Sequence, residues 1–241
     1  MKKKWIAFSS LILALCLLAS SLPAYAATTT SSAYNKLVAT YSKKSRHATL
    51  LNEGDTLYNV YVYATAKETR AKTKPAACPA QGKNLFMNQY RIAYFKKGGS
   101  TAEIMNPGSF PLTGKYTFVY TLVGSPNLLV FATCETAPLS SYHIYAMVNG
   151  TLKQINGLSY GVSNAIRATG SGLYQNVEYT PTKKQWSFVN YKLDKTKLKF
   201  VATKTYTMNE EEGKAAYAYW NGSKTAVIND AYIKQHQVGQ E

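Results

Sequence analysis

Tyrosine, valine and threonine alternate with polar residues along much of this chain, and this alternation constrains the fold more than any other feature. A period of two residues in such segments is typical of β-strands. Glycine-containing pairs between them favour hairpin turns, whose central residues need positive φ angles. The predicted strands are 59–63, 90–95, 116–123, 127–133, 141–148 and 197–207, and the turn pairs are Gly98-Gly99, Asn149-Gly150, Asn156-Gly157 and Asn221-Gly222. We therefore predict a mainly β fold of antiparallel hairpins or a meander.

A hairpin unit of aromatic strand, polar turn and apolar strand recurs along the chain. Its copies begin at Tyr90, Tyr142, Trp186 and, more weakly, Tyr217. The first three starts are 52 and then 44 residues apart, which is within the range of propeller blades. Because any sheet of similar hairpins gives the same pattern, a β-sandwich remains equally compatible with it. We expect a small propeller-like or β-sandwich architecture.

Short helices are expected near both ends of the chain. The apolar residues of segment 34–41 recur at i, i+3, i+4 and i+7, which is typical of an amphipathic helix. Segment 229–236 begins with the capping residue Asn229 and carries basic residues toward its end. We predict one β-rich domain over residues 34–241, preceded by a small polar linker over residues 27–33.

Residues 1–26 have the three parts of a secretory signal peptide. Three lysines precede an apolar run, and Ala24 and Ala26 form an A-x-A cleavage pattern before Ala27. An uncleaved membrane anchor is the alternative, because the run approaches the length that spans a bilayer. Lipid modification of Cys16 is disfavoured by its position in the middle of the apolar run. We predict cleavage after Ala26 and a secreted mature chain without a transmembrane segment.

The mature chain contains two cysteines, Cys78 and Cys134. In an exported protein such a pair predicts a disulfide, which would stabilise the fold by roughly 4 kcal/mol through loop closure. Two buried free thiols are the alternative. A zinc site is disfavoured because Cys-x-x-Cys spacing is absent and the histidines are only His47, His143 and His236. We predict no metal site and no cofactor.

The chain is strongly basic, and its charge suggests the chemistry of a partner. Removal of the signal peptide lowers the formal charge from +16 to +13. An excess of this size favours anionic partners such as acidic wall polymers, acidic polysaccharides or anionic lipid surfaces, although solubility alone is an alternative explanation. Only four of the 28 basic residues are arginines. Nucleic acid is therefore an unlikely partner, since its recognition relies heavily on arginine.

The densest combination of lysines and aromatic residues lies in segment 183–192. Its members are Lys183, Lys184, Trp186, Tyr191 and Lys192. Tyrosine and tryptophan are common at binding surfaces because one end is apolar and the other forms hydrogen bonds. A half-exposed sheet selects the same residues for packing alone. We take these five residues as the candidate binding surface.

Motifs for catalysis are absent from the sequence, and we assign no catalytic residue. The chain has no Gly-x-Ser-x-Gly elbow, and the spacing of its few acidic residues singles out no pair for glycoside hydrolysis. The acidic run 210–212 is expected in a solvated loop between strands. His143 lies between tyrosines of a predicted strand, where it could act as a general base on an acidic polysaccharide. An ordinary strand histidine is the simpler interpretation.

Segment 217–235 combines an aromatic strand, an Asn-Gly-Ser turn and a short helix with a tyrosine. It resembles the tails of uncharacterised secreted β-rich proteins of Gram-positive bacteria, a resemblance that implies no activity. We expect a secreted, non-catalytic binding or surface-associated module for an anionic cell-envelope polymer or glycan. One alternative is a lyase or hydrolase that acts on acidic polysaccharide through His143, and another is a protein-binding inhibitor or interaction module.

Overall fold

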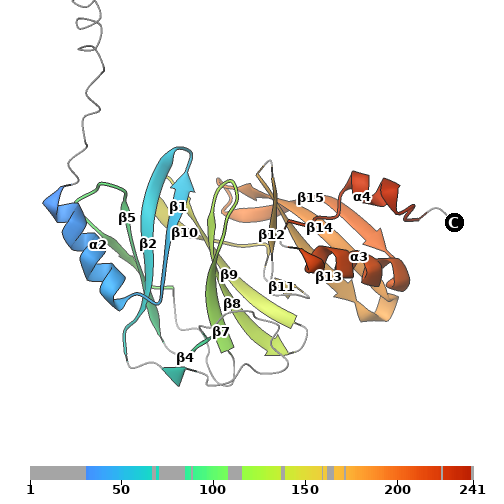
Figure 1. Cartoon of the computed structure of the whole chain (residues 1–241), viewed down its shortest axis with the longest axis horizontal. Helices are drawn as coiled ribbons and strands as arrows, with labels where there is room; N and C mark the ends of the chain where they lie inside the picture. Colours follow the sequence, from blue (N-terminus) through green and yellow to red (C-terminus); the bar gives the residue numbers. More distant parts are fainter. Residues whose placement is uncertain are drawn as a thin grey trace, which may run out of the picture. The chain divides into compact units, whose positions relative to one another are not determined.

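A computed structural model of the chain describes residues 31–66, 69–70, 85–87, 89–107, 116–136, 139–158, 160–161, 166–170, 172–223 and 225–239. Within these residues the strands form three antiparallel sheets, which we call sheets A, B and C (Figure 1). The predicted signal peptide, its cleavage position and Cys78 lie outside the described residues. The disulfide between Cys78 and Cys134 therefore stays a prediction, although Cys134 itself lies in a strand of sheet B.

The strands follow one another along the chain mostly as meanders. Sheet A has the order β1 (His47–Glu53), β2 (Thr56–Ala64), β5 (Tyr90–Lys96) and β6 (Glu103–Met105). Sheet B has the order β10 (Thr151–Ile155), β9 (Leu139–Val148), β8 (Leu128–Thr136), β7 (Tyr116–Leu122), β4 (Leu85–Met87) and β3 (Thr69–Arg70), and β11 (Tyr160–Gly161) also pairs with β9. Sheet C has the order β12 (Arg167–Gly170), β13 (Leu173–Thr180), β14 (Gln185–Asp194) and β15 (Lys199–Met208).

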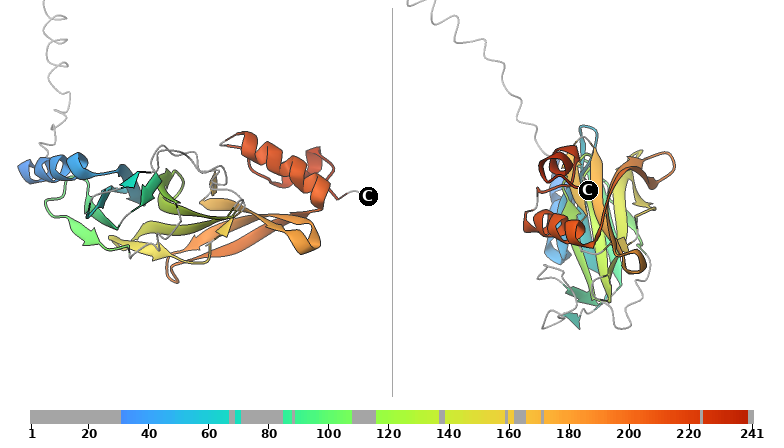
Figure 2. Two further views of the ribbon diagram at one scale, coloured as in Figure 1. Left: turned by 90° about the horizontal axis from the view of Figure 1, so that it is seen from below. Right: turned by 90° about the vertical axis from the view of Figure 1, so that its right-hand side faces the viewer.

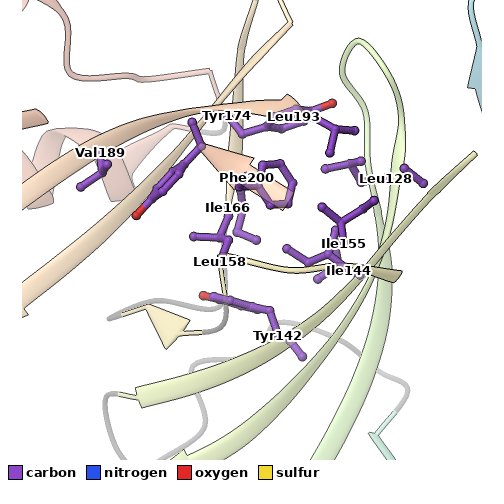
Figure 3. Packing of buried hydrophobic residues seen from close by; sticks show 14 of the residues in the cluster. Leu128, Tyr142, Ile144, Ile155, Leu158, Ile166, Tyr174, Val189, Leu193 and Phe200 are labelled. Carbon is purple, nitrogen blue, oxygen red and sulfur yellow. The ribbon is translucent and has the colours of Figure 1, made fainter. Parts of the chain in front are cut away.

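The middle of sheet B is buried on both faces, and residues 128–132 of β8 show why this part of the strand is continuously apolar. Leu129 and Phe131 pack with residues of sheet A in one core cluster. Leu128 and Val130, which alternate with them, pack with residues of sheet C in another cluster. In Figure 3 side chains of sheets B and C point toward one another across this second core. A strand covered on both faces loses the alternation of apolar and polar residues.

Helices cover the outer faces of the two other sheets. Helix α2 (Ser32–Lys44) packs on sheet A, where Tyr41 stacks on Tyr61 with ring centroids 6.1 Å apart. Helices α3 (Glu210–Gly222) and α4 (Asp230–Gln235) pack on sheet C (Figure 2). Both predicted terminal helices are therefore present. Helix α2 begins at Ser32, inside the segment expected to be linker, because the Ser31 side chain caps it by accepting a hydrogen bond from the Tyr34 N–H.

Two of the predicted turn pairs form hairpin turns. Asn149 and Gly150 have φ angles of 52° and 72° between β9 and β10, as a turn with two positive φ angles requires. Gly98, with φ 82°, lies in the turn between β5 and β6. A short 3-10 helix, η2 (Pro181–Lys183), makes the turn between β13 and β14.

The prediction of a fourth hairpin unit is wrong, because residues 217–222 belong to helix α3. The acidic residues 210–212 are likewise not in a loop; they form the first turn of this helix, where carboxylates interact favourably with the helix dipole. Asn156-Gly157 does not form a hairpin turn either. Asn156 instead bridges to Lys199 of β15. At both Asn-Gly pairs the local preference for a turn was overridden, by helix formation at Asn221-Gly222 and by a contact between sheets at Asn156-Gly157.

The mainly β, antiparallel class with terminal helices is confirmed. The sheets stack face to face through shared cores, as in a sandwich with an additional layer. Among the described strands none of the three sheets closes into a barrel or a propeller. The described residues after position 30 form one compact unit.

Candidate functional site

The structure does not bring the five residues of the predicted binding surface together. Trp186 and Tyr191 lie in β14, and both are buried, at 8% and 9% exposure. Trp186 packs under helix α3, whereas Tyr191 belongs to the core between sheets B and C. Residues of β14 do point alternately to the two faces of sheet C, but both faces are covered at Trp186 and Tyr191, so neither side chain reaches the surface. Only Lys183, Lys184 and Lys192 are exposed.

Lys183 and Lys184 line a hollow of about 610 Å³ at the end of sheet C. Its other wall is the first turn of α3, which carries Glu210, Glu211 and Glu212. A hydrogen bond from Lys214 lowers the pKa of Glu210, and Lys184 lowers this pKa further. The hollow therefore contains charges of both signs, and it is a poor site for a polyanion.

A second lysine group is exposed at the opposite end of β14. Lys153 of β10 and Lys195 of the β14–β15 turn line one hollow of about 460 Å³. Lys195 and Lys192 line a neighbouring hollow of about 470 Å³. We call this surface, made by Lys153, Lys192 and Lys195, the basic groove. It takes Lys192 from the predicted binding surface and adds Lys195, three residues further along the chain, and Lys153, which is distant in the sequence.

Backbone hydrogen bonds between sheets B and C hold the walls of the basic groove. The Asn156 N–H donates to the Leu198 carbonyl at 2.9 Å, and the Phe200 N–H donates to the Asn156 carbonyl at 2.8 Å. Gly157 follows with φ 86°, and a Cβ atom at this position would lie 2.8 Å from the Phe200 carbonyl oxygen. Asn156-Gly157 therefore makes a close junction between two sheets, for which its glycine is required.

The β9–β10 turn above the groove is fixed from the other side by Glu53 of β1. Its carboxylate accepts hydrogen bonds from the N–H groups of Asn149 and Gly150 at 2.6 and 2.8 Å. Charge-assisted bonds of this kind are stronger than bonds between neutral groups. Because both oxygens of the Glu53 carboxylate accept hydrogen bonds from the turn, this carboxylate does not form an ion pair with the lysines of the groove.

Asp194, the last residue of β14, is also engaged locally. Asp194 accepts hydrogen bonds from the N–H groups of Thr196 and Lys197 at 3.0 and 2.9 Å. In the part of the chain that the structure describes, lysine ion pairs join Lys197 to Asp194, Lys204 to Asp230 and Lys214 to Glu210. Lys153, Lys192 and Lys195 have no ion-pair partner among the same residues. Asp194 also lines the hollow of Lys192 and Lys195, but its ion pair is with Lys197. The three lysines of the basic groove therefore leave it a net positive charge among the described residues.

His143, the candidate general base, lies in β9 opposite Phe131 and is half-buried. Among the described residues no group of three histidine, cysteine, aspartate or glutamate side chains is placed to hold a metal ion. None of the described helices is both long and apolar enough to cross a membrane. No family model, curated protein or solved structure matches the chain.

Proposed function

We propose that the chain is a non-catalytic module that binds an anionic polymer or glycan of the cell envelope through the basic groove. The observation that carries the proposal is the placement of Lys153 and Lys195 in one hollow without an ion-pair partner among the described residues. Repeated weak contacts between ammonium groups and a polyanion add up along the polymer. Hydrogen-bonded hairpins hold the backbone at these lysines, so binding does not have to order it.

The test compares variants of equal net charge. We expect the mature chain from Ala27 to be retained on immobilised polygalacturonate and polyphosphate at low salt and released at high salt, because salt screens exposed charges. Replacement of both Lys153 and Lys195 by glutamine should weaken retention strongly. The control replaces Lys96, which ends β5, and Lys97, which follows it, by glutamine and removes the same charge from a different, exposed position.

The two double variants distinguish a site from a general effect of charge. Equal loss of retention in both would mean that net charge alone attracts the polymer, and the basic groove would then have no special role. Retention that does not change with salt, or no retention on either polymer, would contradict the proposal altogether. Comparison of the two polymers separates carboxylate from phosphate as the preferred anion.

A further inference from the structure

Arg167 is a buried cation without an acidic partner in the described residues. The residue is 7% exposed at the start of β12. The Nη1 group donates to the backbone carbonyls of Ser223 and Ala226, the latter at 2.9 Å. The guanidinium carbon lies 3.9 Å from the ring centroid of Trp220. Buried charges are ordinarily paired with an opposite charge, whereas among the described residues this one contacts carbonyl oxygens and an aromatic ring.

One edge of this guanidinium has no hydrogen-bond acceptor among the described residues. No described residue accepts a hydrogen bond from Nε or Nη2 of Arg167. These two N–H groups point in the same direction, and their spacing matches the two oxygens of a carboxylate. Burial also lowers the pKa of Arg167, which reflects the cost of leaving the charge in a poorly solvated place. A bound anion would offset that cost.

Arg167 lines a groove of about 680 Å³, a size typical of small-molecule sites, which span roughly 300–1,000 Å³. The walls are mainly apolar: Leu122 ends β7 and Val123 follows it, Ile166 precedes Arg167, and Val227 comes from the connection between α3 and α4. We call this site the Arg167 groove. Apolar walls and one cationic group suit a ligand with one anionic end and an apolar body.

Two strands with an unpaired edge among the described residues border the Arg167 groove. Among the described strands β12 pairs only with β13. Strand β4 pairs with β7 at Thr117 and Phe118, so the end of β7 at Leu122 has no strand on that side within the described residues. The groove is separate from the basic groove, because the two share no lining residue.

We propose that the Arg167 groove binds a small amphipathic carboxylate, with the carboxylate on the Arg167 guanidinium and the apolar body along Leu122, Val123 and Val227. A fatty acid and the C-terminus of an apolar peptide share this chemistry. A polyanion fits poorly, because the groove offers one cation and apolar walls. This proposal does not depend on the function proposed for the basic groove.

Calorimetric titration of the mature chain tests the proposal, with tryptophan fluorescence as a second readout because Trp220 stacks on the guanidinium. The ligands are octanoate and N-acetyl-trileucine, and the neutral controls are octanol and the amide of the same peptide. We expect saturable binding of at least one acid and binding about tenfold or more weaker for its neutral control, since a charge-assisted contact is lost. The two acids distinguish the two sources of the carboxylate.

Substitutions at Arg167 and Val123 test whether the ligand binds in the Arg167 groove. Arg167→Met should abolish the preference for the acid over its neutral control. Because Arg167 also bonds to backbone carbonyls, this variant could fail to fold, and a second pair of variants at Val123 covers that case. Val123 is 74% exposed at the rim of the groove. Val123→Glu should weaken binding of the acid relative to Val123→Gln, because a carboxylate at the rim repels the ligand.

Each result of these measurements either supports or contradicts binding of a carboxylate in the Arg167 groove. No binding of either acid, or equal binding of an acid and its neutral control, would overturn the proposal. Full binding by a folded Arg167→Met variant would do the same. Equal affinity of Val123→Glu and Val123→Gln for the acid would show that the carboxylate does not enter this groove.

Discussion

Gly213 in helix α3 shows how much a single residue determines in this fold. A Cβ atom at this position would lie 2.3 Å from Cδ1 of Trp186, so helix and sheet approach each other only because the side chain is absent. We expect Gly213→Ala to lower the free energy of unfolding by about 1–3 kcal/mol through overpacking, despite the better helix propensity of alanine. Chemical denaturation of the variant and the parent measures the difference.

Gly222 in the same helix provides the matched control. A Cβ atom there meets nothing within 4 Å, so Gly222→Ala should leave stability unchanged or raise it by up to about 1 kcal/mol. If both substitutions had the same effect, the contact with Trp186 would not be the cause.

Trp186 and Gly213 also show what residue patterns leave undetermined. The sequence correctly predicted that Trp186 lies in a strand next to exposed lysines, and Lys192 of the predicted surface does line the basic groove. It could not show that helix α3 covers Trp186, since that contact joins distant segments. Tyr191 was misjudged for a related reason, because period-two alternation identifies an exposed face only when one face of the sheet is in water.

At the scale of elements, the N-terminus of α3 depends on a capping box. The Asn209 side chain accepts hydrogen bonds from the N–H groups of Glu211 and Glu212, both at 3.0 Å, and the Glu212 carboxylate accepts one from the Asn209 N–H. We expect Asn209→Ala to lower the free energy of unfolding by about 1 kcal/mol, whereas Asn209→Asp should keep the cap and most of the stability. Equal losses in thermal unfolding of both variants would contradict this role.

The same capping box is a signal that the sequence contained and the prediction missed. Asn209 followed three residues later by Glu212 is a recognised helix start. The strong strand pattern before it and Asn221-Gly222 after it favoured a hairpin instead. Most strands and both terminal helices could be predicted, because they follow local periodicity. The stacking of the sheets could not, because contacts between distant segments decide it.

His47 joins two sheets and should make their contact sensitive to pH. Its Nε2 atom in β1 lies 2.9 Å from Oγ1 of Thr121 in β7, and burial lowers the pKa of His47 from its ordinary value of 6.5. Below that value the unfolded chain takes up a proton that the folded protein resists. The free energy of unfolding should therefore fall as the pH decreases from about 7 to 5.5.

Denaturation of the parent and of His47→Gln over this pH interval checks the prediction. The variant should show a weaker dependence on pH, because its side chain does not titrate while His143 and His236 remain. Identical pH dependence in the two proteins would assign the effect to other groups.

At the scale of the whole molecule, the cores depend on tyrosines that must stay protonated. Burial raises the pKa of Tyr145, Tyr174 and Tyr191, and burial together with a hydrogen bond to Glu103 raises that of Tyr94 to about 12. These residues lie in the cores on both sides of sheet B. Above a pH of about 10 the phenols ionise in the unfolded chain and resist ionisation in the folded one.

The folded protein should therefore lose stability steeply in alkaline solution. Each such phenol lowers the free energy of unfolding by about 1.4 kcal/mol per pH unit between its unfolded and folded pKa values. Parallel titrations by tyrosinate absorbance and far-ultraviolet circular dichroism should show a late group of tyrosines that ionises together with unfolding. Tyr145→Phe removes one ionising phenol, so it should reduce the slope of stability against pH above about 10. If all tyrosines ionised while the circular dichroism stayed native, the folded cores would tolerate phenolate. Ionisation of the buried tyrosines would then not be the cause of instability at high pH.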